Sequence, residues 1–174
     1  MLLARRLLAG TIAAAAVSAL TALPAAASVQ RPTGRTGHPV CLDASNDRVN
    51  GTRVYLLQCL GNTNQRFVID NGLIKVEDTI GTGRQEMCLD ASNDRVNGTR
   101  VYLFQCLGNT NQIWVIKRGE LIIKDSIASG RPVCLDASND RANGTPVYLF
   151  QCLGNTNQKF VIDNGLIKVK DTLS

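Results

Sequence analysis

The sequence predicts an all-β fold assembled from three copies of one structural unit. A stretch that begins with CLDASNDRVNGT at Cys41 returns almost unchanged at Cys88 and at Cys134, so the copies start 47 and 46 residues apart. A period of about 20–50 residues is typical of folds built from repeated supersecondary units. Apolar residues follow a β pattern within each copy, and no segment after residue 37 has a convincing helical periodicity.

Each copy contains four candidate strands. Two turn-rich loops and one tight turn separate them, and this turn is Asp-Asn-Gly in the first and third copies. Along the second candidate strand, Val54 and Leu56 lie on one face and Tyr55 lies on the other. In the first copy the four strands are expected at residues 39–44, 54–58, 65–69 and 73–76. Three such copies give about twelve strands in all.

The repeated unit is too small to be stable alone, because four short strands bury little apolar surface. Three units that close around a shared axis leave no strand edge open. An open solenoid is the alternative, but its end repeats would need a different outer face, and these copies are too alike for that. We therefore expect a closed arrangement of three units in one domain.

The first residues resemble an export signal. Arg5 and Arg6 precede an apolar run at residues 7–23, and small residues up to Ala27 resemble a cleavage site. A membrane anchor is the weaker alternative, because the run is short for a spanning helix. We expect secretion after cleavage near Ala27. The expected organisation is a signal peptide at 1–27, a flexible lead-in at 28–37, and a domain at 38–174 with repeats at 41–87, 88–133 and 134–174.

The charge of the chain does not indicate a nucleic-acid or membrane partner. The net charge of +5 falls to +3 once Arg5 and Arg6 are removed, and the remaining basic residues are scattered.

Each copy has two cysteines, which are always 18 positions apart. Export makes disulfides the expected state, and repeat symmetry leaves two patterns, within each copy or between neighbouring copies. We prefer the pairing within copies. Zinc is disfavoured, since there is no C-x-x-C spacing and no repeated histidine. The segment DASNDR lacks the glycine and the closing glutamate of a calcium loop, so we expect neither a metal nor a cofactor.

The order of motifs in each copy resembles the ricin B-type lectin family, which includes the sugar-binding modules of many actinobacterial xylanases. The motifs are C-L-D, N-G-T, a strand ending in cysteine, and Gln-x-Trp or Gln-x-Phe, and the resemblance covers residues 38–174. It implies a β-trefoil with a pseudo-threefold axis, with Phe67, Trp114 and Phe160 in the central core. It also implies the disulfides Cys41–Cys59, Cys88–Cys106 and Cys134–Cys152.

A shallow sugar site needs a carboxylate that accepts hydrogen bonds from neighbouring hydroxyls, an amide that both donates and accepts, and a ring that covers the C–H face. By resemblance, the carboxylates are Asp43, Asp90 and Asp136. The amides are Asn64, Asn111 and Asn157, and the residues that support the aspartates from behind are Gln65, Gln112 and Gln158. The stacking position holds Leu57, Phe104 and Phe150, and the nearby Tyr55, Tyr102 and Tyr148 are candidates to share this role.

Family members usually carry Trp or Tyr at the stacking position, and this sequence departs from that pattern. Because Leu57 has no ring, we expect the second and third sites to bind and the first to be weak or inactive. Structural roles stay open for the same residues: the aspartates and asparagines as loop caps, and Phe104 and Phe150 as packing beneath a loop. Asn50-Gly51-Thr52 matches a glycosylation acceptor, although an Asn-Gly turn is favoured.

The sequence thus predicts a secreted, non-catalytic carbohydrate-binding module for galactose- or xylose-type sugars, with up to three sites that act together on a glycan or a xylan-type polysaccharide. A separate secreted enzyme is a further candidate partner. An enzyme is disfavoured, because identical pairs such as Asp43 and Asp47 in every copy do not form one acid and one base, and His38 is unrepeated. The alternative is a β-trefoil scaffold or inhibitor that binds protein.

Overall fold

The computed structural model describes residues 37–173, and the predicted signal peptide lies outside them. Each repeat forms four strands, so the all-β prediction is confirmed. The first repeat has β1 (Val40–Ala44), β2 (Thr52–Gln58), β3 (Phe67–Asp70) and β4 (Leu73–Val76). The second has β5 (Met87–Ala91), β6 (Thr99–Gln105), β7 (Trp114–Lys117) and β8 (Glu120–Ile123). The third has β9 (Val133–Asp136), β10 (Tyr148–Gln151), β11 (Phe160–Asp163) and β12 (Leu166–Val169).

Short helical turns connect these strands. They are η1 (Thr63–Gln65), η2 (Glu77–Thr79), η3 (Thr156–Gln158), η4 (Lys170–Thr172) and the one-turn helix α1 (Lys124–Ala128). Among residues 37–173, no helix is long and apolar enough to span a membrane.

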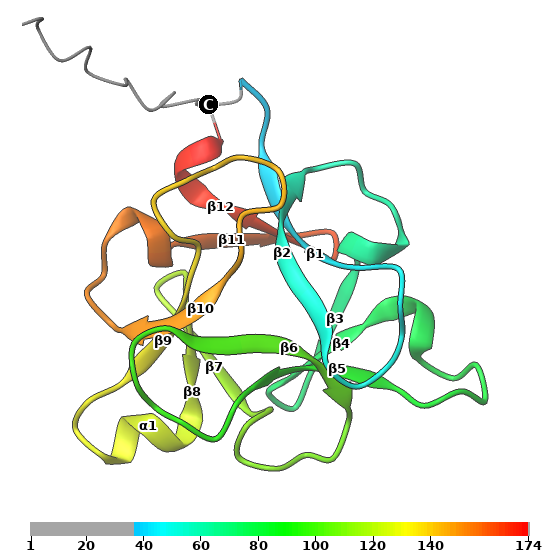
Figure 1. The fold of residues 1–174 in the computed structure, drawn as a ribbon, viewed down its shortest axis with the longest axis horizontal. Helices are drawn as coiled ribbons and strands as arrows, with labels where there is room; N and C mark the ends of the chain where they lie inside the picture. The colour runs from blue at the N-terminus through cyan, green and yellow to red at the C-terminus, as the bar shows by residue number, and fades with distance from the viewer. Residues whose placement is uncertain (1–36, 174) are drawn as a thin grey trace, which may run out of the picture. The chain divides into compact units, whose positions relative to one another are not determined.

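The strands form a closed ring of three repeats. The fourth strand of each repeat pairs with the first strand of the next, as β4 with β5, β8 with β9 and β12 with β1. The last of these pairings joins the end of the domain to its beginning, which excludes a solenoid. The second strand β6 also pairs with β2 and with β10, and β2 meets the segment before β10 through a bridge between Tyr55 and Pro146. Figure 1 shows β2, β6 and β10 as three sides of a triangle around the centre.

The ladder between β1 and β2 separates a core face from an outer face, as the alternation in the sequence predicted. Val40, Leu42 and Ala44 are buried on the core face, together with Val54 and Leu56 of β2. The outer face carries the alternate residues, and there Asp43 lies opposite Tyr55. The same ladder recurs in β5–β6 and β9–β10.

The aromatic residues of the Gln-x-Trp and Gln-x-Phe motifs lie in the core. Phe67, Trp114 and Phe160 are each only 3% exposed. Each is also tied to a neighbouring repeat, because its main-chain N–H donates to the carbonyl of a hairpin-turn glycine, for example Trp114 to Gly72 at 2.8 Å. A Cβ atom at Gly72 would lie 3.1 Å from the carbonyl oxygen of Trp114, and φ there is +86°, so the turn requires glycine.

Two predicted boundaries are wrong for a physical reason. The third strand begins at Phe67 rather than Gln65, because Gln65 ends the helical turn η1. The second strand begins earlier, at Thr52, because the Asn-Gly turn pairs with the next repeat. There Gly51 N–H donates to the Leu103 carbonyl at 2.8 Å, and Asn50 Oδ1 accepts from Gln105 N–H at 2.7 Å. Asn97 and Asn143 make the same contact to their neighbours.

All six cysteines form disulfides within their own repeats, as preferred from the sequence. The pairs are Cys41–Cys59, Cys88–Cys106 and Cys134–Cys152, with Cα–Cα distances of 5.0, 5.0 and 5.1 Å. Each bridge ties the first strand of a repeat to the loop that follows its second strand. This fixes the ladder that carries the candidate site residues.

Candidate functional site

The outer face of each ladder brings together a carboxylate and two side chains from the neighbouring strand. Asp43, Asp90 and Asp136 lie directly opposite Tyr55, Tyr102 and Tyr148. Two residues further along, Leu57, Phe104 and Phe150 lie opposite the first cysteine of each repeat. The candidate carboxylate, tyrosine and stacking residue therefore share one face in all three repeats.

The glutamines are fully buried and hold the loop that precedes them. Gln65 Oε1 accepts from Leu60 N–H at 2.7 Å and from Gly61 N–H at 3.0 Å, and its Nε2 donates to the Gln58 carbonyl at 2.9 Å. The other two repeats keep these bonds and add one to the aspartate. Gln112 Nε2 donates to Asp90 at 2.9 Å, and Gln158 Nε2 donates to Asp136 at 3.1 Å. Gln65 makes no such bond to Asp43.

The asparagines belong to a network that the sequence did not reveal. Asn64 donates to Asn46 at 2.7 Å and accepts from the guanidinium of Arg48 at 2.8 Å. Arg48 also forms a bidentate ion pair with Asp78, at 2.9 and 3.0 Å. Arg95 with Asp125, and Arg141 with Asp171, repeat this arrangement around Asn111 and Asn157. Each asparagine is thus positioned by its loop and keeps one side-chain N–H for a ligand.

The three carboxylates differ in access to solvent. Asp43 is fully buried, Asp90 is 3% exposed and Asp136 is 8% exposed. Neither oxygen of Asp43 has a hydrogen bond of ordinary geometry. Burial raises the pKa of Asp43, and the nearby Gln65 and Tyr55 side chains offset the rise only in part. Burial likewise raises the pKa of Asp90, against a lowering by the Gln112 hydrogen bond.

The loop after the aspartate takes a different course in the third repeat. In the first two repeats, Ser45 N–H and Ser92 N–H donate to the carbonyls of Arg53 and Arg100 at 3.1 Å, which extends the ladder past the aspartate. Ser138 instead has a left-handed φ of 54°, and its N–H donates to Asp136 Oδ1 at 2.8 Å. The residue opposite this loop is Pro146, where the other repeats have arginine.

A pocket of about 510 Å³ lies at the third repeat, and we call it the third-repeat pocket. Four predicted residues line it: Asp136, Tyr148, Phe150 and Asn157. Phe150 is 36% exposed, so its ring is available to a ligand. Asp136 uses two of the roughly four acceptor positions of a carboxylate, in its bonds to Ser138 and Gln158, and the others remain for a ligand.

Other lining residues were missed from the sequence. Leu153 and Asn155 come from the LGNTN loop of the same repeat, and Asn97 and Gly98 come from the Asn-Gly turn of the second repeat. The leucine that begins each LGNTN loop was the signal by which the sequence could have indicated this wall of the pocket. The structure leaves that leucine exposed in every repeat. The contribution of the neighbouring repeat depends on the closed ring and has no local signal.

Comparison with known proteins places this geometry in a family. A sequence profile for the ricin-type beta-trefoil lectin domain matches residues 33–160. The chain belongs to this family. The domain is thus a β-trefoil lectin domain, and the predicted carboxylate, tyrosine and stacking residue recur on the outer face of each repeat. No curated protein matches this lectin domain.

Two solved structures are similar to the lectin domain in fold. One is the β-trefoil lectin of the Vibrio vulnificus hemolysin/cytolysin, crystallised with N-acetyl-D-lactosamine bound, with 20% sequence identity and a TM-score of 0.54 over 70% of this chain and 82% of that chain. The other is ThreeFoil, a designed threefold symmetric protein, with 21% identity and a TM-score of 0.54 over 70% and 94% of the two chains.

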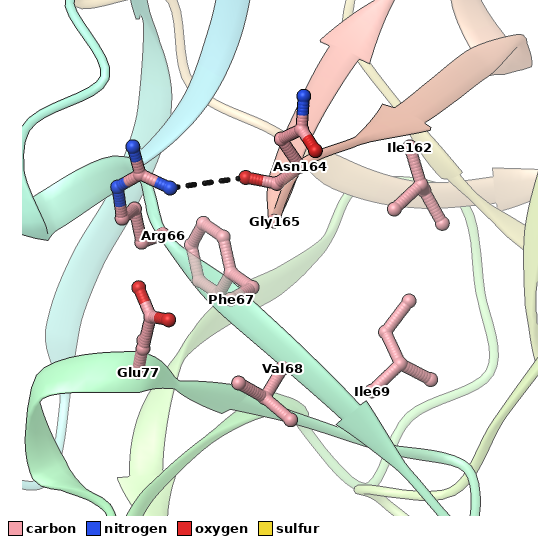
Figure 2. Close-up of a pocket in the computed structure, with 8 residues that line it drawn as sticks. All are labelled: Arg66, Phe67, Val68, Ile69, Glu77, Ile162, Asn164 and Gly165. Atoms are coloured by element: carbon pink, nitrogen blue, oxygen red, sulfur yellow. Dashed lines mark hydrogen bonds between the residues drawn. The ribbon is translucent and has the colours of Figure 1, made fainter.

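A second hollow lies between the hairpins of the first and third repeats (Figure 2). Arg66 donates across it to the Asn164 carbonyl at 3.1 Å, and Val68, Ile69 and Ile162 supply apolar walls. None of the predicted sugar-binding residues lines this hollow. Within residues 37–173, no cluster of His, Cys, Asp and Glu side chains has the arrangement of a metal site.

Proposed function

We propose that this lectin domain is a secreted, non-catalytic module that binds galactose- or xylose-type sugars, chiefly in the third-repeat pocket. The proposal rests on one observation, which is that one open pocket is lined by Asp136, Asn157, Tyr148 and Phe150. Membership of the lectin family supports a carbohydrate ligand, and the similar Vibrio lectin was crystallised with a galactose-containing disaccharide.

Each of these side chains suits one part of a sugar. The free acceptor positions of Asp136 take hydrogen bonds from two neighbouring hydroxyls. The remaining N–H of Asn157 donates to a third oxygen, and the guanidinium of Arg141 holds that amide in place at 2.8 Å. The exposed ring of Phe150 covers the apolar C–H face.

The same features rank the three sites. The second repeat keeps a ring, and Phe104 meets Tyr102 edge-on with centroids 6.4 Å apart, but Asp90 is almost closed off. The first repeat has Leu57 in place of a ring and a sealed Asp43. We therefore propose that the third site binds best, the second weakly, and the first not at all. Binding at two sites of one rigid domain would raise the apparent affinity for a polysaccharide.

Secretion is supported by the signal-like residues before Ala27 and by three disulfides, which persist in oxidising compartments. The proposed mature protein begins near Ser28 and acts alone or beside a separate secreted enzyme. A non-catalytic role is supported by the recurrence of the same pair of aspartates in every repeat, which does not form one acid and one base. Mass spectrometry of the exported protein tests the cleavage site.

Calorimetric titration with galactose, lactose and xylobiose tests the function. We expect Phe150→Ala to weaken binding about tenfold, because an interface aromatic that covers a sugar face contributes roughly 1–2 kcal/mol. Leu57→Ala, at the same position of the first repeat, is the matched control and should change nothing. Asp136→Asn should also abolish most binding, and Asp43→Asn should not. No signal on any sugar or polysaccharide would contradict the proposal and favour the protein-binding scaffold.

A further inference from the structure

The second strands of the three repeats meet around a hollow that no sugar-site residue except Tyr148 borders. Its volume is about 260 Å³, and its walls include Arg53, Arg100, Pro146 and Tyr148. Arg53, Arg100 and Pro146 occupy equivalent positions of β2, β6 and the segment before β10. We call this feature the axial hollow, because it lies where β6 pairs with β2 and β10 and where β2 meets Pro146.

The two arginines of the axial hollow carry uncompensated charge. Both side chains are exposed, and neither forms an ion pair within residues 37–173. Arg53 only approaches the ring of Tyr55, with 6.0 Å from the guanidinium carbon to the ring centroid. No carboxylate lines the hollow. By contrast, the arginine at the centre of each loop network is neutralised by a bidentate ion pair with an aspartate, as Arg48 is by Asp78.

The axial hollow adjoins the third-repeat pocket. Tyr148 borders both, and Arg100 is the cross-strand partner of Tyr148. The turn residues Asn97 and Gly98, which wall the third-repeat pocket, lie just before Arg100 in the same repeat. Tyr148 is thus the cross-strand neighbour of Asp136 on one side and of Arg100 on the other.

We infer that the axial hollow is an anion subsite of the third sugar site, and that the preferred glycan bears a carboxylate or sulfate on the unit next to the sugar held by Asp136. The inference rests on the proposed function. A guanidinium presents a planar fork of donors that matches a carboxylate or sulfate. Two guanidinium groups with no acidic partner in the hollow also attract an anion over several ångströms. Added salt screens this electrostatic attraction.

Paired ligands test the inference by calorimetry. The pairs are lactose with 3′-sialyllactose, and xylotriose with glucuronic-acid-substituted xylotriose. For the pair whose neutral member binds, we expect the anionic member to bind about tenfold more tightly at low salt, as one charge-assisted contact allows. Arg100→Gln should remove this advantage and leave the neutral sugar unchanged, and Arg53→Gln should reduce it. Arg100→Lys should retain part of it, because the charge stays while the fork is lost.

Arg84→Gln is the matched control, because it removes the same charge from an exposed loop arginine outside the hollow. The inference is contradicted if the neutral and anionic sugars bind equally to the unmodified protein, or if Arg84→Gln lowers the anionic preference as much as Arg100→Gln. In both cases binding of the neutral sugar would leave the proposed function standing. Failure of both neutral sugars to bind would contradict the proposed function itself.

Discussion

Ser138 donates its main-chain N–H to the carboxylate of Asp136 at 2.8 Å, whereas the equivalent serines of the other repeats extend a β ladder. This one change of partner accompanies the left-handed backbone at Ser138 and the more open aspartate. It occurs opposite Pro146, which replaces the arginine of the other repeats and whose carbonyl accepts from the Ser138 hydroxyl at 3.3 Å. The loop therefore distinguishes the third site from the second, which carries the same stacking residue, and from the first, which has Leu57.

Restoring the arginine should close the third site. We expect Pro146→Arg to draw Ser138 into the ladder geometry seen at Ser45 and Ser92, and so to seal Asp136. Losing one hydrogen bond to a charged group predicts about a tenfold loss of affinity for the neutral sugar. Sugar titration measures this, with circular dichroism to verify folding. Unchanged affinity would show that Pro146 does not control access to Asp136.

Asp43→Asn should stabilise the domain in a pH-dependent way. Burial raises the pKa of Asp43 above its ordinary value of 3.8, so the folded state prefers the protonated carboxyl. Ionisation at pH 7 therefore costs stability, and this cost disappears below the ordinary pKa. We expect a gain of about 1 kcal/mol at pH 7 and a much smaller gain near pH 3.5.

Urea unfolding at the two pH values measures this gain. Asp47→Asn is the control, because Asp47 is an exposed neighbour. A gain of equal size at both pH values would mean that the charge of Asp43 is not the cause.

Replacing the arginine at the centre of each loop network should lower the free energy of unfolding, and the loss should be larger where the arginine is more deeply buried. The side chain of Arg141 is 8% exposed, compared with 15% for Arg48 and 20% for Arg95. We expect Arg141→Ala to destabilise the domain by about 3 kcal/mol, because it leaves a half-buried Asp171 without its partner. Arg48→Ala and Arg95→Ala should cost less.

Denaturant unfolding of the three variants checks this order. Arg53→Ala is the control, since Arg53 has no ion pair in the described part of the chain, and its effect should stay within about 0.5 kcal/mol. Equal losses at all four positions would refute the link to burial.

Gly119→Ala should weaken the contact between the second and third repeats. Its φ is +79°, and an added Cβ atom would lie 3.0 Å from the Phe160 carbonyl oxygen, so both strain and a clash oppose alanine. We expect a loss of about 2–3 kcal/mol. Gly81→Ala has a positive φ of +67° but no atom within 4 Å, and should cost about 1 kcal/mol. Thermal unfolding compares them, and similar losses would mean that the close approach is unimportant.

Much of the fold was predictable, because its determinants are local. Alternation placed Val54 and Leu56 on the core face, and the Asp-Asn-Gly turn located β4 to the residue. The start of β3 was not predictable from alternation, because the buried Gln65 side chain holds its own loop amides and bends the chain there.

The candidate site was predictable in composition but not in accessibility. The recurring Asp, Asn and Gln residues were found from the repeats, yet the burial of Asp43 depends on how Ser45 and Arg53 meet across the ladder. The ion pair of Arg48 with Asp78 joins residues 30 positions apart, and only folding brings them together. Its recurrence in every repeat was the one available signal.

The Asn-Gly turns have a consequence for how such a domain can change in size. The asparagine of each copy accepts a hydrogen bond from a glutamine main-chain N–H of the next copy, and the last asparagine, Asn143, accepts from Gln58 of the first copy. Deleting one copy from this domain would remove the present partners of one asparagine and of one glutamine N–H in the two copies that remain. The three copies of this domain therefore depend on one another, and a substitution inside one copy disturbs the ring less than the loss of a whole copy does.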